Sequence, residues 1–129
     1  MAKLGRTVAV IGVLGGALLF GIGVRYLVVP EAATLSFGVG KRPQAYELYY
    51  IIGIRNLWLG ALAIGFALLR EWRALALWFA IGSLVCFADA GIAASSVGRL
   101  SHIAFHTGCG LACCGLAGLA WGLHRNRSD

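Results

Sequence analysis

Four apolar runs dominate the sequence, and each is long enough to cross a lipid bilayer as a helix. They cover about residues 7–29, 46–69, 72–97 and 100–123, and at most two Asp, Glu, Lys, Arg or His side chains interrupt each run. A spanning helix needs about 20 predominantly apolar residues. The chain is 60% hydrophobic and only 12% charged, which is typical of membrane proteins. We therefore predict an all-α fold: a four-transmembrane-helix antiparallel bundle that forms one integral membrane domain over residues 1–129, in contact with the lipid bilayer.

The net charge of +6 is divided unevenly between the two sides of such a bundle. One side carries six basic residues: Lys3, Arg6, Arg70, Arg73, Arg125 and Arg127. The other side carries Lys41, Arg42 and Arg99, with Arg25 near the end of its span. By the positive-inside rule, we expect a multi-pass protein of a bacterial cytoplasmic membrane with both termini cytoplasmic. The basic residues flank the spans and form no single patch, so no nucleic-acid partner is predicted.

One connection between the runs is long. It reads "PEAATLSFGVGKRPQA", residues 30–45, and holds both prolines of the chain. We expect this segment to be the only candidate lid or vestibule. The other two connections, at "REWR" and "SSVGR", are short enough to join antiparallel neighbours in tight hairpins.

The fourth run carries a polar stripe within "SHIAFHTGCGLACC", residues 101–114. At about 100° per residue, four side chains fall within roughly 60° of one another on a helix: His102, His106, Cys109 and Cys113. A tight turn near residues 97–98 would place Asp89 opposite His106, and Cys86 opposite Cys109. These pairs predict an antiparallel seam between the third and fourth spans.

The "REWR" turn brings Arg55 to the same depth as Asp89. Arg55, Asp89 and His106 would then share one layer about 10 to 14 Å below the outer boundary, at about 1.5 Å of rise per residue. Ionisable residues at this depth rarely face lipid. Two interpretations stay open: an Arg55–Asp89 ion pair that locks the helices together, or a functional polar pocket open to the outer side.

The pocket interpretation assigns catalytic roles to four residues: Arg55, Asp89, His106 and His102. It assigns substrate binding to seven others: Glu47, Tyr46, Tyr49, Tyr50, Asn56, Cys86 and Cys109. The tyrosines alone also fit an interfacial aromatic belt, and Arg25 and Glu47 also fit side chains that reach back to the interface.

No metal or cofactor is predicted. The fourth helix rises about 16 Å between His102 and Cys113, so four ligands from one straight helix cannot surround one ion. At most one adjacent pair, His102 with His106 or His106 with Cys109, could contribute to a metal site, completed by Cys86 or Asp89. Cysteine is also a common small packing residue in apolar helices.

Glycine pairs four residues apart occur in the first and last spans, at Gly12 and Gly16 and at Gly118 and Gly122. This spacing allows close backbone approach. It fits packing inside the bundle, or a homo-oligomer through glycine-rich helix faces.

Several short motifs resemble a family of small four-helix integral membrane proteins of unknown function with bacterial and fungal members. The resemblance covers most of residues 30–106, through "YYIIGIRNLWLG", "WRALALW", "FADAG" and "HIAFH". It implies a Gly-x-Arg-Asp motif in the second helix, an Asp in the third and a His in the fourth. Asn56 stands where the family usually has Asp, which puts a mechanism with two acids in doubt.

These observations favour a membrane-embedded enzyme that isomerises, cyclises or hydrolyses a lipophilic small molecule by general acid and base chemistry. Arg55 would be an electrostatic clamp, Asp89 a base or orienting group, and His106 the acid–base partner, with His102 closer to the entrance. The alternatives are a small proton-coupled transporter and a structural or accessory membrane subunit.

Overall fold

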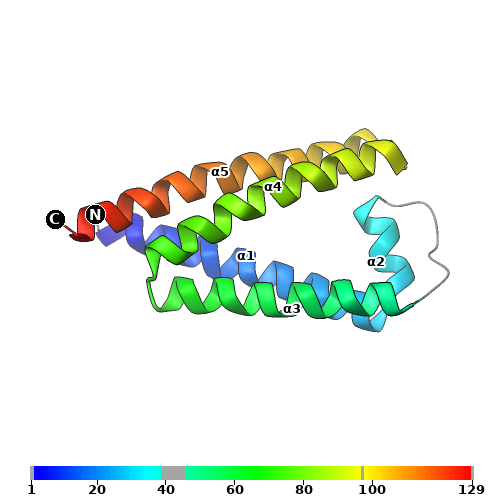
Figure 1. Cartoon of the computed structure of the whole chain (residues 1–129), viewed down its shortest axis with the longest axis horizontal. Coiled ribbons are helices and arrows are strands. Elements are labelled where there is room, and N and C mark those ends of the chain that lie inside the picture. Colours follow the sequence, from blue (N-terminus) through cyan, green and yellow to red (C-terminus); the bar gives the residue numbers. More distant parts are fainter. Residues whose placement is uncertain (1, 39–45, 97, 129) are drawn as a thin grey trace.

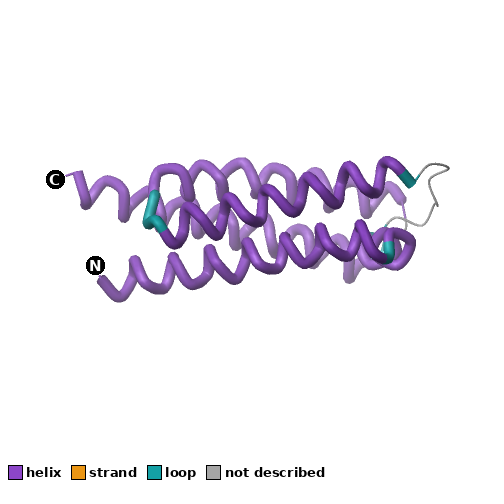
Figure 2. The backbone as a smooth tube through the Cα atoms, turned by 90° about the horizontal axis from the view of Figure 1, so that it is seen from below, coloured by secondary structure: helices purple, strands orange, loops and turns teal. Residues whose placement is uncertain are grey.

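The protein is described from a computed structural model, which covers residues 2–38, 46–96 and 98–128. In this part of the chain there are five helices and no strand: α1 (Ala2–Val28), α2 (Pro30–Phe37), α3 (Glu47–Leu68), α4 (Trp72–Ser96) and α5 (Leu100–Ser128). The four long helices are apolar enough to cross a membrane. They run up and down, with both termini at one end (Figures 1 and 2). The predicted all-α bundle of four membrane-spanning helices is therefore confirmed.

The four long helices form two closely packed pairs, α1 with α3 and α4 with α5. The pairs meet near the chain termini and diverge toward the opposite end, where α2 lies (Figure 1). The shared core lies at the end with the termini and draws on all four long helices: Val8, Ala67, Trp72, Leu75, Ala76, Phe79, Ala120 and Leu123. A smaller cluster near α2 joins Tyr26, Ala33 and Tyr49 but includes no residue of α4 or α5. The bundle is consequently wedge-shaped.

Direct backbone contact holds α1 against α3. A Cβ atom added at Gly60 would lie 2.5 Å from the carbonyl oxygen of Gly16, and one added at Gly23 would lie 2.7 Å from that of Gly53. Helices can approach this closely only where side chains are absent. The predicted packing of Gly12 and Gly16 inside the bundle is confirmed, because a Cβ at Gly12 would lie 3.0 Å from the Cβ of Ala67.

The glycines of the last span behave differently. A Cβ added at Gly118 or Gly122 would meet nothing within 4 Å. Packing of these two glycines inside the bundle was therefore the wrong expectation. They lie on α5 away from the close α4–α5 contact. That contact instead uses Gly110, where an added Cβ would lie 2.7 Å from the ring of Phe87.

The pairing of α4 with α5 agrees with the predicted seam. The thiol of Cys86 interacts with those of Cys109 and Cys113 across the two helices. The turn between the helices uses Gly98, whose φ is 66° and whose N–H donates to the carbonyl of Ala93 at 2.9 Å. This left-handed conformation suits glycine because other residues clash sterically there.

The first part of the long connection after α1 is helical. Residues Pro30–Phe37 form the helix α2, which has proline in its first turn and ends at Gly38 with φ of 103°. Proline tolerates the first turn because its missing N–H has no helical partner there, and glycine favours the left-handed cap. Residues 39–45, the rest of the expected lid with Lys41 and Arg42, lie outside the described residues.

Two helix ends also differ from the predicted spans. Helix α1 begins at Ala2 and α5 continues to Ser128, so both are longer than the apolar runs 7–29 and 100–123. The additional turns carry basic side chains, whose charged ends can reach the membrane surface while their backbone stays helical.

The backbone contact between α1 and α3 makes a testable prediction. Replacement Gly60→Ala should destabilise the protein by about 1 to 3 kcal/mol, because the added methyl group would press on the backbone of α1. Thermal unfolding in detergent, followed by circular dichroism, measures the effect. Gly65→Ala is the matched control on the same helix, since nothing lies within 4 Å of its Cβ position. Equal unfolding temperatures for the two variants would contradict the close contact.

Candidate functional site

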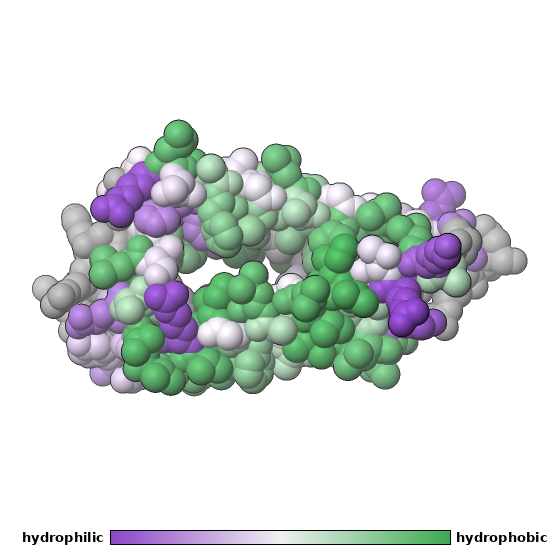
Figure 3. All heavy atoms as spheres, turned by 180° about the vertical axis from the view of Figure 1, so that it is seen from behind, coloured by the Kyte–Doolittle hydropathy of each residue, from purple (hydrophilic) through white to green (hydrophobic). Residues whose placement is uncertain are grey.

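The divergence of the two helix pairs leaves space between them at membrane depth. The space-filling view in Figure 3 shows an opening between the pairs, bordered mostly by hydrophobic residues, with hydrophilic side chains near its α2 end. Polar residues from four helices gather at that end. We call the group formed by Tyr26, Thr34, Asp89 and His106 the wedge site.

His106 is one of the buried polar groups of the wedge site. It is only 8% exposed, and its ring lies 4.6 Å from that of Phe37, centroid to centroid. Its Nε2–H donates to the backbone carbonyl of Phe37 at 3.1 Å. A carbonyl oxygen only accepts hydrogen bonds, so Nε2 must carry a proton. In the neutral imidazole, Nδ1 is consequently free to accept a proton.

Asp89 lies on α4 at the level of His106. Its carboxyl group is half-buried and lies within electrostatic reach of His106 on α5 and of Tyr26 on α1. Tyr26 is only 5% exposed, and its side chain lies close to that of Thr34 on α2, whose hydroxyl donates to the carbonyl of Pro30 at 2.9 Å. The predicted neighbours Asp89 and His106 therefore come together, with Tyr26 and Thr34 facing them from the other pair.

Helix α2 bridges the open end of the wedge. Its last residue, Phe37, contacts α5 through the hydrogen bond with His106, and at the capping residue Gly38 an added Cβ would lie 2.9 Å from Nδ1 of His102. That Nδ1 atom is buried without a hydrogen-bond partner in the described structure. Arg25 of α1 donates to the carbonyl of Ala32 at 3.5 Å. Both helix pairs thus hold α2.

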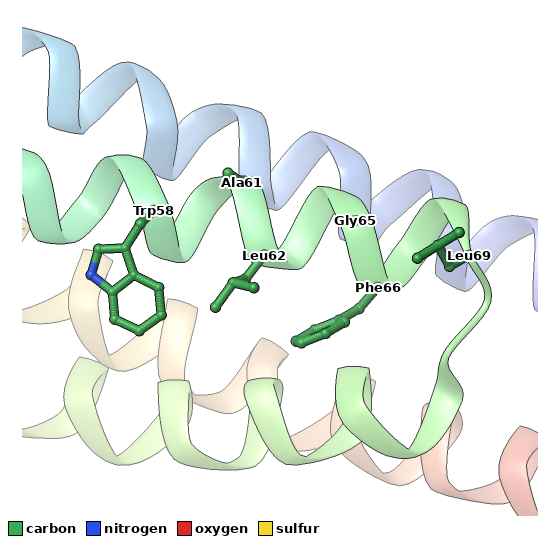
Figure 4. Close-up of a pocket in the computed structure, with 6 residues that line it drawn as sticks. All are labelled: Trp58, Ala61, Leu62, Gly65, Phe66 and Leu69. Atoms are coloured by element: carbon green, nitrogen blue, oxygen red, sulfur yellow. The ribbon is translucent and has the colours of Figure 1, made fainter.

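Arg55 was expected to share a layer, and in one interpretation an ion pair, with Asp89. Among the described residues, Arg55 is exposed and makes no ion pair with Asp89. On a helix wheel it points within about 20° of both Leu62 and Phe66, which extend from α3 toward α4 in Figure 4. Arg55 therefore lies on the face of α3 that looks across the wedge. The divergence of the pairs leaves it apart from the carboxylate.

The expected substrate-binding residues separate into several places. Tyr46, Glu47 and Tyr50 are exposed, and the hydroxyl of Tyr46 donates to Oε1 of Glu31 at 2.8 Å. Tyr49 is buried beside Tyr26, with ring centroids 6.3 Å apart. The remaining three are half-buried: Asn56, Cys86 and Cys109.

An apolar groove continues from Arg55 along α3. Its volume is about 410 Å³, and it is lined by Trp58, Ala61, Leu62, Gly65, Phe66 and Leu69. Figure 4 shows Trp58, Leu62 and Phe66 extending from α3 toward α4. The groove starts one helical turn from Arg55, since Trp58 is three residues further along the helix.

Two members of the wedge site, Tyr26 and Thr34, and the His106 partner Phe37 were not predicted from the sequence. The signal for two of them was present, because Pro30 and Gly38 mark the start and the end of a short helix. Tyr26 offered no such signal, since a tyrosine near the end of a span fits an interfacial belt equally well.

The donor set of the wedge suits proton transfer. A carboxylic acid, an imidazole and a phenol can each donate or accept a proton.

In the described part of the chain, no three His, Cys, Asp or Glu side chains are grouped as a metal site requires, and all four cysteines are free thiols.

Comparison with known proteins places the chain in a family. Neither the curated proteins nor the solved structures contain a match. A family described as "Domain of unknown function (DUF4267)" matches residues 16–123, which include α2, the groove and the whole wedge site. The chain therefore belongs to the DUF4267 family of domains of unknown function.

Proposed function

We propose that the protein is a membrane-embedded enzyme that acts on a lipophilic small molecule by general acid and base chemistry. The observation that carries this proposal is the position of Asp89 and His106 within electrostatic reach of each other on adjoining helices, at the α2 end of the bundle, where the two helix pairs diverge. A ligand dissolved in the bilayer could reach these groups from the side without crossing water.

The environment of His106 supports a role in proton transfer. The Phe37 carbonyl holds the Nε2–H, which orients the ring and leaves Nδ1 as the basic nitrogen. An imidazole exchanges protons near neutral pH. His106 would take and return a proton, and Asp89 would orient or assist it as a second base.

The remaining expected residues have secondary roles in this proposal. Arg55 would stabilise negative charge on the substrate, and His102 would line the approach beside Gly38. Seven further residues would contact the substrate along its path: Glu47, Tyr46, Tyr49, Tyr50, Asn56, Cys86 and Cys109. Isomerisation, cyclisation and hydrolysis all use such groups without a cofactor.

The orientation of the bundle is part of the proposal. We propose a bacterial cytoplasmic membrane with both termini cytoplasmic, which would make the wedge site face outward. The supporting observation is that both termini and the α3–α4 turn, where six basic residues gather, lie at one end of the molecule.

Cysteine labelling tests this orientation. In a background with the four native cysteines replaced, Arg99→Cys should react with a membrane-impermeant maleimide added to intact cells, whereas Arg125→Cys should react only after permeabilisation. Arg99 and Arg125 are both exposed and lie at opposite ends of α5. Labelling of residue 125 and protection of residue 99 in intact cells would reverse the proposed topology.

Loss of the acid–base groups tests the catalytic proposal. The purified protein in lipid nanodiscs would be incubated with membrane lipid extract, and mass spectrometry would identify compounds that it converts. His106→Gln and Asp89→Asn should each slow the conversion by at least about 10²-fold, the lower end of what general acid–base groups contribute. His124→Gln, at the other end of α5, is the matched control and should retain the rate.

The outcomes of this experiment separate the three hypotheses. An unchanged rate in folded His106→Gln protein would remove His106 from the mechanism. If no compound changes with the wild-type protein, the enzyme proposal is wrong, and proton-driven flux in liposomes then distinguishes a small transporter from an accessory subunit. A homo-oligomer stays a prediction, and the open face at Gly118 and Gly122 is the surface it would use.

A further inference from the structure

Arg55 and the α3 groove are adjacent. Together they are chemically complementary to a molecule with an anionic group at one end and an apolar chain. The guanidinium is the cationic group at the start of an apolar groove that runs from Trp58 to Leu69. Side chains on a helix tilt toward its N-terminus, so Arg55 extends toward the α2 end and the wedge site. A charged end and an apolar length thus follow each other on one face of α3.

The positive charge of Arg55 needs an anionic partner at this depth. It lies eight residues into α3, about 12 Å from the helix start at about 1.5 Å per residue. No described carboxylate forms an ion pair with it. An arginine at such depth is costly unless it reaches the interface or pairs with an anion. Arginine also binds carboxylate and phosphate through two parallel hydrogen bonds, which makes an anionic ligand a suitable partner.

The groove has the dimensions of a chain-binding site. It spans about 16 Å between Trp58 and Leu69 at about 1.5 Å per residue, and its volume is about 410 Å³. All its lining residues belong to α3 and are apolar apart from the Trp58 ring nitrogen, and Trp58, Leu62 and Phe66 extend toward α4 (Figure 4).

We propose that the α3 groove binds the hydrocarbon chain of a single-chain amphiphile whose anionic head is held by Arg55. This inference rests on the proposed function, because it names the class of substrate that enters the wedge. Binding in this way brings the atoms next to the anionic head to the level of Asp89 and His106. The alkyl chain lies toward the termini.

Quenching of Trp58 fluorescence tests the proposal. The full-length protein, in nanodiscs of zwitterionic phosphatidylcholine, would be titrated with a long-chain fatty acid that carries bromine atoms on its chain. Bromine quenches tryptophan on contact, so a saturable component should appear in the wild type and disappear in Trp58→Phe. Arg55→Gln should raise the half-saturating concentration at least about tenfold, because a charge-assisted hydrogen-bond pair is lost. Arg99→Gln, outside the groove, is the matched control and should bind as the wild type does.

Titrations with probes that differ only in their head group identify the chemistry of the ligand. The brominated alcohol of equal length should bind the wild type about as weakly as the acid binds Arg55→Gln. A brominated alkyl phosphate that binds more tightly than the carboxylate supports the anionic head and identifies it as phosphate.

Two results would overturn the inference, and they differ in what they mean for the proposed function. Equal affinity of acid and alcohol, unaffected by Arg55→Gln, rejects the anionic head and leaves the lipophilic site intact. No saturable quenching by any probe, in protein of normal helical content, rejects the groove as the binding site. The conversion assay with the Asp89 and His106 variants then decides separately whether the wedge site is catalytic.

Discussion

The backbone contact between Gly16 and Gly60 is the constraint on which the rest of the bundle depends. Because no side chain separates α1 from α3 there, these helices form one unit whose remaining faces must pack elsewhere or meet lipid. The second unit, α4 with α5, joins the first mainly through the core near the termini. Two units that join at one end leave a wedge at the other, and that wedge is where polar residues can lie without facing lipid.

Helix α2 connects the two helix pairs across the wide end of the wedge. The hydrogen bond from His106 to the Phe37 carbonyl connects α5 to a helix that belongs, through Ala33, to the cluster of the other pair. A histidine within an apolar bundle needs a partner for its N–H. Here the partner is a backbone carbonyl at the end of a short helix, so the same bond satisfies the imidazole, selects its tautomer and limits how far the pairs separate.

The sequence predicted those features of the fold that depend on the length of an apolar run or on the geometry of a short turn. The spans followed from apolar runs of sufficient length, and the approach of Asp89 to His106 followed from a tight turn that sets the register of α4 against α5. Helix α2 was missed because eight residues show too little periodicity to identify a helix against a loop, so that only Pro30 and Gly38 at its two ends signalled it. The Arg55–Asp89 ion pair was not found because the "REWR" turn sets relative depth but not the angle at which α3 and α4 diverge.

The separation of Arg55 from Asp89 changes what a polar layer in this bundle can do. Opposite charges in direct contact inside a membrane largely neutralise each other and mainly hold helices together. Held on diverging helices, the cation and the carboxylate keep their capacity to interact with a third group placed between them. The cost of leaving them apart is lowered where a polar ligand completes the layer. On the proposed function, the wedge between the separated charges receives a polar group from the bilayer side, while the core near the termini holds the two helix pairs together.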